Sequence, residues 1–233
     1  MITLYQFEIS PFCDKVRRIL HYKNQPYTIE EISVLDTILG KIKRLNPAGK
    51  LPSIKHENQI VNDSTDIAEY LENIFPDPPL IPSDPKEKAL MHFLEDWADE
   101  YLYFYEMHLR LVLPHNAKKW SAEALKNDSW LLKTLLPFAM PMTFKKVTSA
   151  QGLGRKNIEQ ILKELDIHLQ SLTDWLGDAE WLVGSHITIA DISVYCQLFC
   201  IAGSEEGREM LSRFESVAAW MNRVDEATLP KNA

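Results

Sequence analysis

Cysteine is scarce in this sequence. Its 233 residues contain three, Cys13, Cys196 and Cys200, and their spacing matches neither a disulfide framework nor a metal-binding pair. A small disulfide-stabilised secreted domain and a zinc module are therefore excluded. Unpaired thiols are typical of a reducing compartment, so we expect the protein to be cytoplasmic and to hold no structural metal.

Long apolar segments and an excess of positive charge are also missing. No apolar run approaches the roughly 20 residues that cross a bilayer, and Met1 to Leu4 lead straight into a strand-like segment, so we expect neither a signal peptide nor a membrane partner. The 25 Lys and Arg against 33 Asp and Glu give a net charge of −8. We expect no nucleic-acid partner, because phosphate binding needs clustered basic residues.

The composition is otherwise that of a globular protein, with 45% hydrophobic and 25% charged residues. Strand and helix patterns alternate over about the first 75 residues. Ser10-Pro11 opens the first helix as N-cap and first helical residue, and that helix ends before Pro26. We expect strands at residues 2–7, 27–32, 51–55 and 59–61, and further helices at residues 36–45 and 64–75. The order βαβαββα predicts an α/β domain over residues 1–76.

A proline-rich segment follows this domain. Residues 77–85 fit neither helix nor strand and are interpreted as a linker. The remaining residues, 86–233, contain only helical patterns, which predict an all-α domain. We expect its helices at residues 86–113, 122–150, 155–176, 188–202 and 207–226. Pro137 and Pro141 predict a kink or loop near residues 135–142.

Four motifs follow one another along the chain. The first is Ser10-Pro11-Phe12-Cys13, and the second is Asn-Pro-Ala-Gly-Lys-Leu-Pro-Ser-Ile at residues 46–54. The third, Asn-Asp-Ser-Thr-Asp at residues 62–66, opens a helix, and the fourth, at residues 184–192, contains Thr188 and Asp191 at the spacing of a capping box. Together with the α/β and all-helical halves, these motifs resemble the cytosolic glutathione transferase superfamily of the serine type across essentially the whole chain.

The resemblance implies a thioredoxin-like N-terminal domain, a helical C-terminal domain, glutathione as co-substrate and a homodimer. It implies a cis bond before Pro52, which would leave the Leu51 backbone free to pair with the cysteinyl part of glutathione. Lys50 is expected to meet the glycyl carboxylate, Asp63 the ammonium group and Ser64 the γ-glutamyl carboxylate. The family most often has Glu at the position of Asp63, which is one methylene shorter.

Ser10 and Cys13 are the candidate catalytic residues. The Ser10 hydroxyl, at a helix N-terminus, can stabilise the glutathione thiolate by a charge-assisted hydrogen bond, or it can serve only as an N-cap. Cys13 lies one helical turn later. It resembles the resolving position of a Cys-Pro-x-Cys pair, or it is a buried apolar residue.

Aromatic residues of the helical domain are candidates for the second substrate. A stripe recurs on one expected helix face and comprises Trp97, Tyr101, Phe104, Tyr105 and His108. Such a stripe is either core or pocket. We expect Tyr101, Tyr105 and His108, with Phe12, to line a site for a small hydrophobic electrophile beside Ser10.

The leading hypothesis is a transferase that joins the sulfur of glutathione to this electrophile. One alternative is a glutathione-dependent thiol-disulfide reductase that uses Cys13. Another is a non-catalytic transferase-like module that binds a partner or an apolar ligand.

Overall fold

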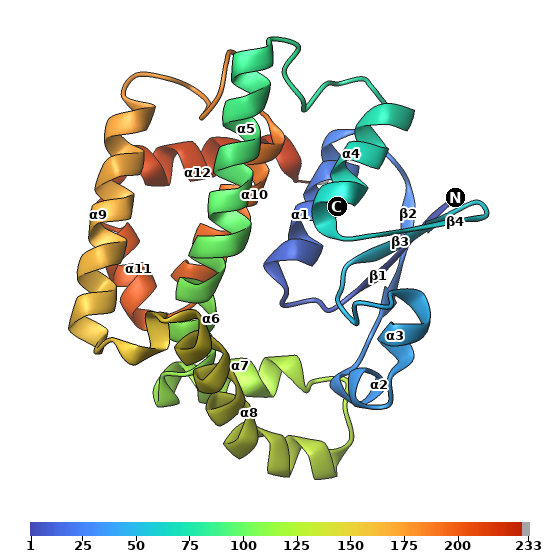
Figure 1. The fold of residues 1–233 in the computed structure, drawn as a ribbon, viewed down its shortest axis with the longest axis vertical. Coiled ribbons are helices and arrows are strands. Elements are labelled where there is room, and N and C mark those ends of the chain that lie inside the picture. The colour runs from blue at the N-terminus through green and yellow to red at the C-terminus, as the bar shows by residue number, and fades with distance from the viewer. Residues whose placement is uncertain (230–233) are drawn as a thin grey trace.

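A four-stranded mixed sheet forms the first part of the protein in the computed structural model, which describes residues 1–229 (Figure 1). Its strands are β1 (Ile2–Gln6), β2 (Tyr27–Glu31), β3 (Ser53–His56) and β4 (Gln59–Asn62). Their spatial order is β2-β1-β3-β4, with β1 and β2 parallel and the other two pairs antiparallel. The predicted α/β thioredoxin-like fold is confirmed.

The helices of this domain begin where the sequence provides caps. They are α1 (Pro11–Tyr22), α2 (Val34–Ile38), α3 (Lys41–Leu45) and α4 (Ser64–Ile74). Ser10 is the N-cap of α1 and Pro11 its first residue. One helix was predicted at residues 36–45, but Gly40 has a φ of 75° and separates α2 from α3. Only glycine adopts this left-handed conformation without steric cost.

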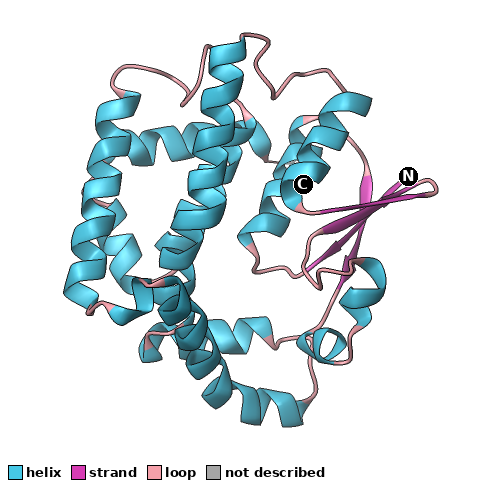
Figure 2. Ribbon diagram, viewed as in Figure 1, coloured by secondary structure: helices cyan, strands magenta, loops and turns pink. Residues whose placement is uncertain are grey.

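The second part of the protein is helical throughout the described residues (Figure 2). It contains α5 (Pro85–Trp97), a π-helical turn η1 (Ala98–Leu102), α6 (Tyr103–Leu111), α7 (Pro114–Ala124), α8 (Trp130–Gln151), a 3-10 turn η2 (Leu153–Arg155), α9 (Ile158–Leu176), α10 (Ile189–Ala202), α11 (Glu205–Leu211) and α12 (Glu215–Thr228). The predicted all-helical domain is confirmed, and its last four residues lie outside the described part. No helix within residues 1–229 is long and apolar enough to cross a bilayer.

Two local predictions for this domain were wrong. One helix was predicted at residues 122–150, but α7 begins at Pro114, a residue that suits the first turn of a helix, and α8 is a separate helix. α8 is unbroken at Pro137 and Pro141, so the predicted kink or loop is not a loop, and Figure 1 shows the lower part of α8 changing direction. The helix predicted at residues 207–226 is two helices, α11 and α12.

The fourth motif organises the core of the helical domain. The Asp191 carboxylate is fully buried and accepts hydrogen bonds from the Thr188 N–H, the Leu182 N–H and the Trp220 indole at 2.8–2.9 Å. The predicted bond of the capping box between Asp191 and Thr188 is confirmed. The same carboxylate joins α10 to α12 and to the preceding loop, so the motif stabilises the fold and lies outside the chemistry.

Candidate functional site

Three of the four motifs meet at one edge of the sheet. Tyr5 of β1 pairs with Ser53, the first residue of β3, and Ser53 pairs with Asn62, the last residue of β4. The chain segments beyond these residues therefore emerge side by side. They are the turn after β1 with Ser10, the loop before β3 with Pro52, and the start of α4.

The turn that carries Ser10 is held by its backbone. The Ser10 N–H donates to the Phe7 carbonyl at 2.9 Å, and the Ser10 carbonyl accepts from the Asp14 N–H at 3.0 Å. The half-buried Ser10 side chain makes no capping hydrogen bond to α1. Its hydroxyl therefore lies at a helix N-terminus, where the dipole favours an anion, and its side-chain contact with α1 is to the Cys13 thiol rather than to the backbone N–H groups.

Cys13 is fully buried, and its sulfur accepts the Phe7 N–H at 3.4 Å. Burial raises the pKa of the Cys13 thiol to about 11, although the Phe7 N–H and the Ser10 hydroxyl act in the opposite direction. Burial also raises the pKa of Cys200 to about 12 and that of Cys196 well above its usual value. This placement favours the packing role of Cys13 over the resolving role that was the alternative.

These thiols should resist modification in the folded protein. At neutral pH, a thiol with a pKa of about 11 is ionised in roughly one molecule in ten thousand. We expect Ellman's reagent to modify less than about one thiol per native chain in the time in which it modifies all three in guanidinium. Rapid modification of one native thiol that disappears in Cys13→Ala would instead support a redox role for Cys13.

The second motif forms the loop before β3. The Asn46 side chain accepts the Ala48 N–H at 2.9 Å and donates to the Lys50 carbonyl at 3.0 Å, which fixes the shape of the loop. The bond between Leu51 and Pro52 is cis, as the resemblance implied. Within residues 1–229 the Leu51 backbone forms no hydrogen bond to another backbone group. An extended peptide could therefore pair with it.

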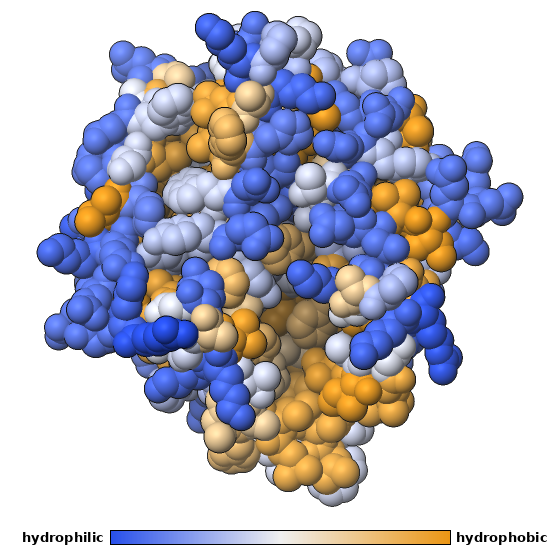
Figure 3. Space-filling model, viewed as in Figure 1, coloured by the Kyte–Doolittle hydropathy of each residue, from blue (hydrophilic) through white to orange (hydrophobic). Residues whose placement is uncertain are grey.

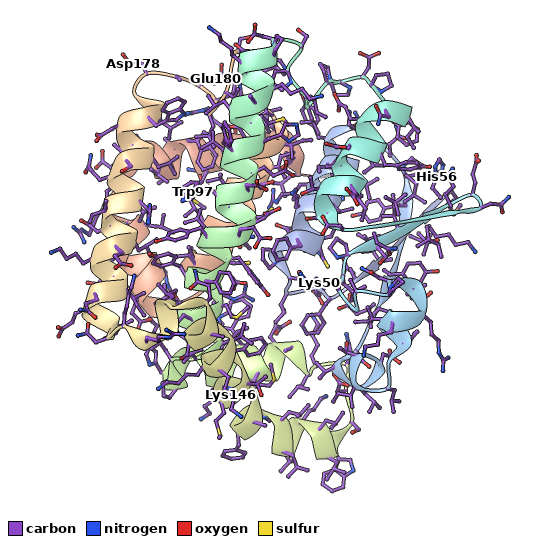
Figure 4. The ribbon with its side chains drawn as sticks, in the orientation of Figure 1. Lys50, His56, Trp97, Lys146, Asp178 and Glu180 are labelled. Atoms are coloured by element: carbon purple, nitrogen blue, oxygen red, sulfur yellow. The ribbon has the colours of Figure 1, made fainter. Side chains whose placement is uncertain are left out.

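Lys50 and the start of α4 add the charged groups of the site. Lys50 is exposed, and Figure 4 shows it at the end of the sheet that faces the helical domain. Asp63 is the N-cap of α4 and has a φ of 73° and a ψ of 138°, an uncommon conformation for a residue other than glycine. Its carboxylate accepts the Thr65 N–H at 3.0 Å. Ser64, the first helical residue, is 4% exposed.

The aromatic stripe of the helical domain faces away from Ser10. Tyr101 and Tyr105 pack with His168 of α9 at ring separations of 5.0 and 5.9 Å. Figure 4 shows Trp97 between α5 and α9. His108 is buried and bonds to Thr148 of α8 at 3.2 Å. The expectation that Tyr101, Tyr105 and His108 line a pocket beside Ser10 therefore needs correction, because these side chains belong to the core between helices.

A polar stripe on the other side of the same helices contacts the N-terminal domain instead. The stripe comprises Glu95, Asp99, Tyr103, Glu106 and Arg110, and it runs through the π-helical turn η1. The Lys15 ammonium on α1 donates to Glu95 at 2.6 Å and to Asp99 at 2.8 Å. The Tyr103 ring meets the Phe12 ring edge-on at 4.8 Å. Apolar periodicity in the sequence does not reveal this stripe, because four of its five residues are charged.

Arg110 of the polar stripe supports the Ser10 turn directly. Its guanidinium donates to the Ile9 carbonyl at 3.1 Å, pairs with Glu106 at 3.1 Å and lies over the Trp120 ring at 3.9 Å. Arg110 is 1% exposed. No sequence motif identified it, since Ile9 and Arg110 are separated by 101 positions in the sequence. It acts as a positioning residue for the turn.

The surface beside this edge is hollowed. Figure 3 shows a recess with an apolar floor between the end of the sheet and the helices below it. The arrangement offers a hydroxyl at a helix N-terminus, an unpaired backbone segment, a lysine and an aspartate-serine pair around one opening. It can bind a short peptide-like thiol with carboxylates at both ends.

Comparison with known proteins gives two matching family models. The glutathione S-transferase N-terminal domain matches residues 4–79, and the glutathione S-transferase C-terminal domain matches residues 131–227. The two models divide the chain as the sheet and the helices do.

Individual relatives share between about a fifth and about two fifths of their aligned residues with this chain. Protein LigF of Sphingobium sp. is 26% identical over 193 residues, which cover 78% of this chain and 72% of that protein. A probable maleylacetoacetate isomerase of Caenorhabditis elegans is 37% identical over 88 residues, which cover 37% of this chain and 41% of the isomerase. The crystal structure of the beta-etherase LigF from Sphingobium sp. strain SYK-6 has a TM-score of 0.69 at 22% identity and covers 96% of this chain and 94% of LigF. At that identity the likeness concerns the fold.

Proposed function

Because the chain belongs to the glutathione S-transferase superfamily, we propose that it joins the thiolate of glutathione to a small hydrophobic electrophile, with Ser10 as the group that stabilises the thiolate. The observation that carries this proposal is the Ser10 side chain at the N-terminus of α1, which makes no capping hydrogen bond. The side-chain oxygen of an N-cap serine with only a structural role would accept a hydrogen bond from a backbone N–H of the first helical turn.

Activation of the thiol is the chemical task of the site. A free thiol has a pKa of about 8.5, so most of it is protonated at neutral pH and is a poor nucleophile. The Ser10 hydroxyl can donate to the sulfur anion, and the dipole of α1 favours negative charge at the same place. Both effects lower the pKa of the bound thiol. The proton leaves to solvent, and the sulfur lone pair then attacks the electrophile as its leaving group departs.

The remaining site residues suit the two ends of glutathione. Ser64 and the first N–H groups of α4 can bind the γ-glutamyl carboxylate, and Asp63 can accept from the ammonium group. Lys50 can pair with the glycyl carboxylate. The Leu51 backbone, which has no backbone partner within residues 1–229, can pair with the cysteinyl segment as an added strand would. Phe12, which contacts Tyr103, borders the opening for the electrophile.

Removing the Ser64 hydroxyl tests the assignment of the γ-glutamyl end. Ser64→Ala should weaken glutathione binding about tenfold, because a hydrogen bond to a carboxylate contributes about 1.5 kcal/mol or more. Titration calorimetry measures this change. Ser171→Ala, at an exposed serine on α9, is the matched control and should bind as the parent does. Equal affinities of the parent and Ser64→Ala would contradict the assigned site.

The reaction class is tested with two model substrates. We expect the protein to conjugate glutathione to 1-chloro-2,4-dinitrobenzene, and to show little exchange with hydroxyethyl disulfide, since Cys13 is buried. Glutathione binding with neither product would indicate the binding module instead. We also propose a homodimer and a cytoplasmic location, as is usual in the superfamily.

A further inference from the structure

Helix α8 presents an apolar face to solvent. Trp130 and Phe138 are 77% and 80% exposed, and Leu131, Leu135 and Met142 are at least half exposed. These five residues, the apolar ridge, fall within an arc of about 140° at 100° per residue, so they share one side of the helix. A helix of a globular protein normally turns such a face to the core. Here the ridge has no partner among the described residues.

The ridge continues onto α2, which is far away in the sequence. The carboxylate of Asp128, two residues before α8, accepts the Leu35 N–H at 2.9 Å and the Val34 N–H at 3.2 Å. This contact ties the start of α2 to the start of α8. Ile38 of α2 and Leu39, the C-cap residue after it, are also well exposed. Figure 3 shows the resulting apolar surface at the lower end of the molecule.

The charged residues of α8 itself are all positive, although Asp128 precedes the helix and Asp36 lies on α2. Residues 129–158 include no Asp or Glu, although the whole chain has a net charge of −8. Their basic residues are Lys133, Lys145, Lys146, Arg155 and Lys156. Within residues 1–229, Lys133, Lys145 and Lys146 form no ion pair, whereas Lys156 pairs with Glu164. Figure 4 shows Lys146 on α8. The Lys133 ammonium donates to the Lys126 carbonyl at 2.8 Å. The ridge therefore combines apolar side chains with lysines that no carboxylate neutralises.

These features distinguish between possible occupants. A second copy packed α8 against α8 about a twofold axis would bring the lysines of the two helices together, and like charges at an interface are unfavourable. The most exposed residues are a tryptophan and a phenylalanine that project outward. An exposed helix face with Trp, Phe and Leu, bordered by lysines, is typical of helices that lie in the interface of an anionic bilayer.

We propose that α8 binds the surface of membranes that contain anionic phospholipids. Trp130, Phe138 and their apolar neighbours enter the headgroup boundary, and Lys133, Lys145 and Lys146 pair with lipid phosphates. Because no helix within residues 1–229 is long and apolar enough to cross the bilayer, α8 would lie at its surface. This inference departs from the sequence expectation of no membrane partner, which considered only spanning segments and signal peptides.

Vesicle co-sedimentation of the full chain tests the proposal. At low salt, the parent protein should sediment with phosphatidylcholine vesicles that contain phosphatidylglycerol at least about tenfold more strongly than with pure phosphatidylcholine. The double variant Trp130→Ser, Phe138→Ser should lose about tenfold or more of this binding, because it removes two inserted rings. Trp130→Phe alone should retain most of it. Lys145→Gln with Lys146→Gln should weaken binding and reduce its salt dependence.

The matched control is Phe93→Ser on α5, which removes an aromatic ring that is 72% exposed. Phe93 is far in the sequence from Lys133, Lys145 and Lys146. This variant should bind vesicles as the parent does. Circular dichroism checks that every variant is folded. Failure of the parent to sediment with anionic vesicles at low salt would overturn the proposal. The proposal would equally be overturned if the double variant bound vesicles as strongly as the parent. It would also be overturned if the parent did not bind vesicles and the double variant differed from it only in its oligomer mass in sedimentation velocity.

Discussion

Replacement of Lys15 by methionine is expected to lower the free energy of unfolding by about 3–5 kcal/mol. Lys15 is 1% exposed, and its ammonium is the counter-charge for Glu95 and Asp99, which lie at 2.6 and 2.8 Å. Burial alone would lower the pKa of Lys15, but the two carboxylates raise it above its usual value, so the side chain is charged in the folded protein. Methionine keeps the volume but removes the ammonium, so Asp99 loses its cation and Glu95 keeps only the partly exposed His92 ring at 3.6 Å. Urea unfolding at neutral pH measures the loss.

Two further variants test whether the loss of stability comes from burying the charges. Lys41 also lies near two carboxylates, those of Glu30 and Asp36, but its side chain is 41% exposed. Lys41→Met should therefore cost less than about 1 kcal/mol. Adding Glu95→Gln and Asp99→Asn to Lys15→Met should recover much of the stability, because the buried charges are then gone. A single variant of Lys15 that unfolds within about 1 kcal/mol of the parent would contradict the argument.

The Lys15 variant should also respond to pH in a defined direction. Burial already raises the pKa of Asp99, despite the opposing charge of Lys15. Without Lys15 this carboxyl binds a proton more readily in the folded state than in the unfolded state. The variant should then gain stability relative to the parent as pH falls from neutral toward the usual carboxyl pKa of about 4. A deficit that stays constant over this window would indicate lost packing as the cause.

Ser10→Ala is expected to lower the rate of glutathione conjugation by roughly ten- to a hundredfold. A hydrogen bond to a charged group contributes about 1.5–3 kcal/mol, and each 1.4 kcal/mol corresponds to about a factor of ten. Because the Ser10 side chain makes no capping bond, the same substitution should leave stability nearly unchanged. Ultraviolet titration of the glutathione complex should show the pKa of the bound thiol rising toward its free value.

The controls for Ser10 use its neighbours in the same turn. Cys13→Ala should keep the thiolate signal, since the Cys13 thiol is buried and protonated at neutral pH. Ser10→Cys should gain thiol-disulfide exchange, because a cysteine at a helix N-terminus has a lowered pKa. If Cys13→Ala abolished the thiolate signal while Ser10→Ala kept it, the reductase alternative would replace the transferase proposal.

The sequence predicted best what local chemistry determines. Caps, prolines and apolar periodicity located α1, α4 and α10, and the capping-box contact of Asp191 with Thr188 is present. It predicted poorly where solvent or tertiary contacts decide. Pro137 and Pro141 remain within α8 because this helix is largely exposed, and water can pair with the carbonyls that proline leaves without a donor.

The site was predictable only as far as its motifs extend. The cis bond before Pro52 was implied by the resemblance to the superfamily, and the gathering of Ser10, Pro52 and Ser64 at one sheet edge follows from the order of motifs and strands. The sequence does not show which side of α5, η1 and α6 contacts the N-terminal domain. These helices have an aromatic side and a polar side, and either could pack against it. The polar side does so through long-range ion pairs such as that of Lys15 with Glu95.

The polar stripe between the two parts of the protein limits how they can be recombined. A chimera that joined this N-terminal unit to another superfamily member's helices would leave the Lys15 ammonium buried without a counter-charge, unless that member supplied two acids at the positions of Glu95 and Asp99. The reciprocal chimera would leave the two acids without their lysine. Substitutions on the two sides must therefore occur together, through intermediates that are poorly stable. The two parts of this chain are separate in architecture, but the buried ion pairs between them mean that they can be exchanged between superfamily members only together.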